Sequence, residues 1–125
     1  MEQEPVCVVH LNGHQEWHVD GRLHRLDGPA RIWPDGSQEW WVDGQLHRLD
    51  GAAVIRADGY RAWYVDAHLH RLDGPALIWA DGDQEWYIRD VDVTQEVTVW
   101  MQQRDITWPW DQETHVAFLL SFVLT

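Results

Sequence analysis

The chain of 125 residues contains no lysine, one cysteine and only two serines. All nine basic residues are arginine, against 21 acidic residues, so the formal net charge is −12. This balance argues against direct nucleic-acid binding and against docking on an anionic membrane, because both require a basic surface. A single cysteine makes no disulfide within the chain, which is typical of proteins from a reducing compartment.

Residue types that carry out catalysis are equally scarce. Neither Ser37 nor Ser121 lies in a Gly-x-Ser-x-Gly motif, and Cys7 lies in an apolar segment where we expect a buried core side chain. The sequence has no glycine-rich phosphate loop and no calcium-loop spacing. We therefore predict a protein that is not an enzyme and that uses no cofactor and no metal ion.

Signals for export or membrane insertion are also missing. The first residues are acidic where a secretion signal is basic, and the apolar run over residues 116–124 is too short to span a bilayer. The length suits a single domain over residues 1–125. We expect a cytoplasmic protein that makes no contact with membranes.

Aspartate, glycine and ten tryptophans dominate what is present, and they recur with a period of 23 residues. Full copies cover residues 12–34, 35–57 and 58–80, and a fourth copy departs from the pattern at Arg89. Residues 1–11 resemble the end of an earlier copy. We therefore divide the chain into an N-terminal partial repeat (1–11), β-repeats (12–88) and a C-terminal cap or interaction segment (89–125).

Turn and strand signals alternate within each copy. Asn-Gly and Asp-Gly pairs separate runs of about five residues that are rich in Trp, Val, Ile and Tyr. This pattern predicts an all-β fold, a repetitive antiparallel meander of stacked hairpins in a single layer, with a short C-terminal capping segment. We expect two paired strands per repeat, a bend at His-Arg-Leu-Asp-Gly-Pro, and no helix before residue 111.

Equivalent positions form rows across the copies. Trp17, Trp40, Trp63 and Trp86 share one position and predict a buried seam. The next position holds His18, Trp41, Tyr64 and Tyr87, which point to the opposite face. A His-Arg-x-Asp stretch recurs at residues 24–27, 47–50 and 70–73. Equivalent histidines in a two-strand repeat lie roughly 9–10 Å apart, too far to share one zinc ion. We interpret these triplets as structural hydrogen-bonding groups.

The C-terminal segment has a different pattern. Alternating valines over residues 91–99 favour a further strand, and Arg104-Asp105 marks a turn. The Trp108-Pro109-Trp110 motif forms a stiff aromatic knob, and Asp111 is a candidate N-cap for a helix over residues 113–124, although a strand stays open there. This segment either caps the last repeat or contacts a partner or a second copy of the chain, and both roles are compatible.

The core pattern Trp-x-Val-Asp-Gly-x-Leu-His-Arg-x-Asp-Gly-Pro-Ala, as at residues 17–30, resembles MORN-type repeats. It is most similar to the variants found in bacterial and phage proteins, and the resemblance covers residues 12–88. It implies stacked hairpins that serve as a scaffold or binding surface, in a bacterial or phage-infected cell. His-Arg-Leu-Asp-Gly replaces the usual His-Gly-x-Gly, and Ala67 replaces a turn glycine.

We predict a non-catalytic acidic protein that occludes a basic, nucleic-acid-binding surface of a partner protein, such as a phage anti-defence inhibitor or DNA mimic. One alternative is a protein–protein scaffold or antitoxin-like module, and another is a nucleotide sponge in which bases stack on tryptophan. The partner-binding candidates are Glu39, Trp41, Asp43, Tyr64, Asp83, Glu85, Tyr87, Asp90, Asp92, Trp108 and Trp110.

Overall fold

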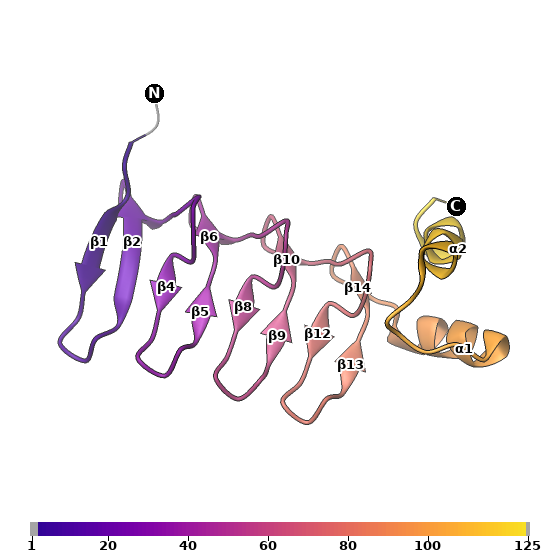
Figure 1. The fold of residues 1–125 in the computed structure, drawn as a ribbon. Coiled ribbons are helices and arrows are strands. Elements are labelled where there is room, and N and C mark those ends of the chain that lie inside the picture. Colours follow the sequence, from indigo (N-terminus) through magenta and orange to yellow (C-terminus); the bar gives the residue numbers. More distant parts are fainter. Residues whose placement is uncertain (1–2, 125) are drawn as a thin grey trace.

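The computed structural model describes residues 3–124. Hairpins stand side by side in a row, and two helices lie at the C-terminal end of the row (Figure 1). The strands are β1 (Val6–Val9), β2 (Gln15–Val19), β3 (Arg22–Leu23), β4 (Arg31–Ile32), β5 (Gln38–Glu39), β6 (Trp41–Val42), β7 (Gln45–Leu46), β8 (Val54–Ile55), β9 (Arg61–Ala62), β10 (Tyr64–Val65), β11 (His68–Leu69), β12 (Leu77–Ile78), β13 (Gln84–Glu85), β14 (Tyr87–Ile88) and β15 (Val91–Asp92). The helices are α1 (Thr94–Arg104) and α2 (Gln112–Phe122).

The main sheet is an antiparallel meander. Its strands lie in the order β1-β2-β4-β5-β8-β9-β12-β13, and β3 pairs with the far end of β2. The β1–β2 hairpin closes at Asn12-Gly13, and the later long hairpins close at Asp-Gly pairs. At the tip between β4 and β5, Gly36 has a φ of 91° and the Ser37 N–H donates to Asp35 Oδ1 at 2.8 Å. The prediction of antiparallel hairpins in a β-rich fold is confirmed.

Three small hairpins, β6–β7, β10–β11 and β14–β15, each form a separate two-stranded sheet. They continue directly from β5, β9 and β13. The sequence predicts a bend in this part of each repeat and no separate pair of strands. Their tight turns use left-handed backbone at consecutive residues, for example Asp43 (φ 51°) and Gly44 (φ 77°). In the second of these turns, between β10 and β11, Ala67 occupies the glycine position with a φ of 68°.

Neighbouring hairpins are joined by hydrogen bonds that recur with the sequence period. Ala53 accepts from Trp40 and donates to Ala62, both at 2.8 Å, and Ala53 is fully buried. On the small hairpins, the Arg48 N–H donates to the Tyr64 carbonyl at 3.0 Å.

The expected strand over residues 91–99 is wrong beyond Asp92. The chain turns into α1, where Asp92 Oδ1 accepts the Thr94 N–H at 2.9 Å. Val97 and Trp100, three positions apart, are buried on one side of this helix, while Val99 is 42% exposed. Packing of that face outweighs the strand preference of its valines and threonines.

Helix α2 begins as the sequence predicts. Asp111 is its N-cap, with Oδ1 accepting the Thr114 N–H at 2.8 Å. The two helices enclose a core cluster of Trp86, Val97, Trp100 and Phe118, in which Phe118 is fully buried. The rings of Trp100 and Phe118 meet edge to face at 6.1 Å between centroids. Trp86, the last tryptophan of its row, is thereby covered by the helices and is only 3% exposed.

The prediction that Cys7 is a buried core residue is wrong. Cys7 is exposed, and so is every residue of β1, including Val6 at 65% and Val9 at 63%. Strand β1 lies at the edge of the sheet with β2 as its one neighbour in the strand order, and the helices lie at the other end (Figure 1). Over residues 3–124, no helix is long and apolar enough to cross a membrane.

Candidate binding surface

Arginines cover the half-buried tryptophans of the sheet. Arg48 Cζ lies 3.8 Å from the Trp40 ring centroid, while its Nε donates to Asp50 Oδ1 at 3.0 Å and its Nη1 to the Ala52 carbonyl at 2.9 Å. The same arrangement links Arg25 to Trp17 at 4.0 Å and Arg71 to Trp63 at 3.9 Å. These three guanidinium groups are engaged inside the protein, so their charge is not free for a ligand.

The histidines beside these arginines join neighbouring hairpins. His24 Nδ1 and His47 Nδ1 accept backbone N–H groups of Asp43 and Asp66, each at 3.0 Å. His70 Nδ1 accepts the Arg89 N–H at 3.1 Å in the same way. Each ring therefore connects one hairpin to the backbone of the next, which agrees with the structural role that the sequence indicates. Burial lowers the pKa of His70, and the charges of Arg89 and His68 lower it further.

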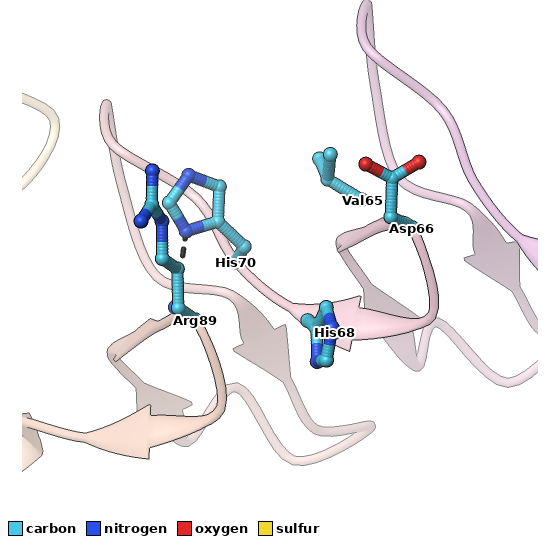
Figure 2. Close-up of a pocket in the computed structure, with 5 residues that line it drawn as sticks. All are labelled: Val65, Asp66, His68, His70 and Arg89. Carbon is cyan, nitrogen blue, oxygen red and sulfur yellow. Dashed lines mark hydrogen bonds between the residues drawn. The ribbon is translucent and has the colours of Figure 1, made fainter.

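A shallow hollow of about 390 Å³ lies between hairpins β10–β11 and β14–β15. Figure 2 shows the hydrogen-bonded pair of His70 and Arg89 on one side of it, Val65 and Asp66 on the other, and His68 between them. His68 Nδ1 lies 2.6 Å from Asp90 Oδ2, and this hydrogen bond is the main cause of the lowered pKa of Asp90. The hollow mixes acidic, basic and apolar groups and does not concentrate one chemistry.

Exposed carboxylates line two edges of the molecule. The tight turns that follow β2, β6 and β10 carry Asp20, Asp43 and Asp66, which we call the turn row; the Asp43 and Asp66 side chains are each 75% exposed. The tips of the long hairpins carry Asp35, Asp58 and Asp81, which we call the tip row. The long-hairpin tips lie along the edge opposite the small hairpins (Figure 1). With two sheet strands per step, neighbours in a row are about 9–10 Å apart.

The structure removes Glu39 from the expected docking surface. Glu39 is only 6% exposed, and its carboxylate accepts from Arg56 at 2.8 Å and from the Trp41 indole N–H at 2.9 Å. Arg31 lies 3.5 Å from the same carboxylate. A buried carboxylate that lies between two guanidinium groups and also accepts an indole N–H is satisfied within the protein.

The aromatic candidates are half-buried. Trp41 donates its indole N–H to Glu39, whereas Tyr64 and Tyr87 pack against the buried cluster of Val54, Ala62 and Leu77. Burial raises the pKa of both tyrosines. Their rings contribute to the packing between the main sheet and the small hairpins, and only their outer edges reach the surface.

The remaining candidates divide into exposed acids and anchoring aromatics. Asp83, Asp90 and Asp92 are exposed, and Glu85 is half-buried on β13 opposite Leu77. Trp108 donates its indole N–H to the Asp73 carbonyl at 3.0 Å, and Trp110 packs in the helical core cluster, 5.7 Å from Trp100. Both tryptophans of the aromatic knob therefore hold the helices against the sheet.

Three histidines of the first hairpin, His10, His14 and His18, surround Glu16, and two of them, His10 and His14, have no role in the sequence interpretation. The alternation of His14, Glu16 and His18 along one strand was the signal that they share a face.

The hairpin row, the two helices and the exposed aspartates define an antiparallel β protein of side-by-side hairpins with a helical end and acidic edges. No family model, curated protein or solved structure matches the chain.

Proposed function

We propose that this chain is a MORN-like hairpin-repeat protein that binds, without catalysis, to a basic surface of a partner protein that handles nucleic acid. The observation that carries the proposal is the turn row of exposed aspartates, repeated at regular spacing on a rigid sheet. Such a protein acts by occupying the site that nucleic acid would take, for example as a phage-encoded inhibitor in the cytoplasm of an infected bacterium.

Internal pairing of arginine supports this proposal. Arg25, Arg48 and Arg71 each bond to an aspartate of their own bend, and Arg31 and Arg56 bond to Glu16 and Glu39. These pairs are electrically neutral, so the whole acidic excess of −12 remains on the other carboxylates. A partner therefore meets a surface whose field is negative, which favours rapid association with a basic protein.

The spacing of the turn row suits a partner that contacts nucleic acid at intervals. One DNA strand presents a phosphate every 3.4 Å or so along the axis, so carboxylates about 9–10 Å apart match roughly every third phosphate. The backbone N–H groups of Asp43 and Asp66 donate to His24 and His47, and these hydrogen bonds fix the position of the turns. A preorganised row loses little conformational entropy on binding.

Helix α2 supports a second contact, with a second copy of the chain or with the same partner. Val116 and Leu120 are four residues apart in this helix and are 47% and 58% exposed, and Leu124, beyond the end of the helix, is 70% exposed. The four-residue spacing places Val116 and Leu120 in one short stripe on the exposed side of α2. An apolar stripe of this kind favours a protein contact, and a homodimer through the C-terminal segment is one form of it.

The two acidic rows allow a matched test. Asp20→Asn, Asp43→Asn and Asp66→Asn together remove the turn-row charges, and asparagine tolerates the left-handed backbone that these turns require. Asp35→Asn, Asp58→Asn and Asp81→Asn remove the same number of charges from the tip row and keep the side-chain oxygen that accepts the turn N–H. Both variants have the same net charge, so any difference reports position.

Binding is measured after capture from nuclease-treated bacterial lysate and purification of the captured protein. We expect the turn-row variant to bind that protein at least about tenfold more weakly, the tip-row variant to bind within about threefold of the unmodified chain, and duplex DNA to compete. A captured protein that binds DNA and this chain at the same time contradicts the occlusion mechanism. Equal binding by all three chains contradicts the assignment to the turn row.

A further inference from the structure

Histidines gather around one buried carboxylate in the first hairpin. His14, Glu16 and His18 alternate along the segment that includes β2, so their side chains share one face of the sheet. His10 follows β1, and the pairing of β1 with β2 brings His10 Nε2 within 3.0 Å of Glu16 Oε1. His18 Nε2 lies 3.5 Å from the same oxygen. The Glu16 side chain is only 12% exposed.

The ligand atoms of His10, His14 and Glu16 all lie within 4.8 Å of one another. His14 Nε2 is 3.8 Å from Glu16 Oε2, and it is buried without a hydrogen-bond partner among the residues that the structure describes. A buried polar atom with no partner is uncommon in folded proteins. Here it points to a group that is not one of the protein's own donors or acceptors.

The surroundings hold these groups in place. The His14 ring is stacked between the rings of His10, at 4.9 Å, and Trp33, at 4.8 Å, and its backbone N–H donates to Asn12 Oδ1. Arg31 Nε donates to Glu16 Oε2 at 2.7 Å, which orients the carboxylate and leaves Oε1 directed toward His10. Hydrogen-bonded support of a carboxylate from behind is a regular feature of metal sites.

Equivalent positions in the other hairpins do not need histidine. The counterparts of His10, His14, Glu16 and His18 are Trp33, Ser37, Glu39 and Trp41 in the second hairpin, Arg56, Tyr60, Ala62 and Tyr64 in the third, and Trp79, Asp83, Glu85 and Tyr87 in the fourth. There, Glu39 is satisfied by Arg56 and the Trp41 indole. The same backbone therefore forms with aromatic and hydroxyl side chains, so folding alone does not account for three imidazoles around Glu16.

We propose that His10, His14 and Glu16 form a binding site for a divalent transition metal ion, with Zn²⁺ as the ion that suits this ligand set. Imidazole nitrogens and a carboxylate oxygen bind zinc at about 2.0–2.2 Å in tetrahedral geometry. A small rotation of His10, whose side chain is 45% exposed, closes the set around an ion, and His18, 3.5 Å from Glu16 Oε1, lies beside it. The inference departs from the expectation of no metal and does not depend on the proposed function.

The test uses the full chain after treatment with a chelator, titrated with Zn²⁺ by calorimetry and with Co²⁺ by visible absorption. We expect one ion per chain, a dissociation constant in the micromolar range or tighter, tetrahedral Co²⁺ bands, and no competition from millimolar Mg²⁺. His14→Phe keeps a ring against Trp33 but removes the nitrogen, and His10→Gln removes an exposed ligand that folding does not require. Each substitution should weaken Zn²⁺ binding at least about tenfold.

His68→Gln is the matched control, because His68 pairs with Asp90 on an exposed part of a small hairpin far along the chain. We expect it to bind Zn²⁺ as the unmodified chain does, and circular dichroism checks that every variant is folded. Three results overturn the proposal: no stoichiometric binding of Zn²⁺, undiminished binding by both His14→Phe and His10→Gln, or binding of Mg²⁺ as tight as that of Zn²⁺.

Discussion

Replacement of Arg48 by lysine separates two explanations for the stability of the sheet. The Arg48 guanidinium stacks on Trp40 and donates at once to Asp50 and to the Ala52 carbonyl. Lysine keeps the positive charge, but its single ammonium group cannot reach all three partners in one geometry. Ala52 is 4% exposed, so its carbonyl would lose its donor in a buried position.

The expected loss follows from these contacts. An unpaired buried carbonyl costs about 1–3 kcal/mol, and a less favourable cation–π contact costs a further ~0.5 kcal/mol or more. We therefore expect Arg48→Lys to lower the free energy of unfolding by about 2–3 kcal/mol. Asp50→Asn should cost less than about 1 kcal/mol, because the Asp50 side chain is 88% exposed and exposed ion pairs contribute little.

Both variants are measured by urea denaturation, followed by tryptophan fluorescence and circular dichroism, and the dependence on urea should match that of the unmodified chain. If Asp50→Asn lowers the free energy of unfolding as much as Arg48→Lys does, the bend is stabilised by the ion pair and not by the guanidinium's hydrogen bond to the Ala52 carbonyl. If Arg48→Lys costs less than about 0.5 kcal/mol, the contact with the buried carbonyl contributes nothing and the reasoning is refuted.

Three other changes test the fold. Phe118→Ala should lower the free energy of unfolding, measured by chemical denaturation, by about 3–5 kcal/mol because the ring is fully buried. Val116→Ala, on the exposed side of α2, should change it by less than about 0.5 kcal/mol. Similar losses in the two variants would show that α2 is not packed as described. Ala67→Gly should raise the free energy of unfolding by up to about 1 kcal/mol, and with it the melting temperature, because Ala67 has a φ of 68°. A lower melting temperature would exclude backbone strain at this position. Burial lowers the pKa of His70 below its usual 6.5, so its contribution to stability is full above about pH 6.5 and is lost as the pH falls below that value. His70→Asn, whose amide oxygen can accept the Arg89 N–H, should weaken this dependence in urea titrations between pH 7 and 5, and an unchanged pH dependence would contradict the assignment.

The sequence predicts the hairpins well because their signals are local. The Asp-Gly pairs at the hairpin ends specify tight turns through their own backbone preference, and the N-cap of α2 depends on Asp111 and its near neighbours alone. Helix α1 was missed because its valines and threonines favour strands, and the contacts that stabilise it come from residues distant in the chain, such as Phe118.

The binding surface was predictable only in part, for a related reason. Glu39 and Asp43 are similar carboxylates in sequence, but two arginines from adjacent strands enclose Glu39 while Asp43 extends from an exposed turn. Which acids are exposed depends on strand register, and so does the meeting of His10 with Glu16. Register is a property of pairing between strands, which composition and turn signals do not specify fully.

The joints between hairpins have a consequence for how such a chain can change over time. Each joint is made from groups that the next 23 residues supply again, such as the His47 ring and the Asp66 N–H. If one 23-residue segment is duplicated or lost, the hairpins that become neighbours can form the same hydrogen bond between a turn N–H and a histidine ring. Recombination within the gene can therefore lengthen or shorten the row by one hairpin at a time. The zinc-ligand candidates at one end and the helices at the other end are unchanged by it.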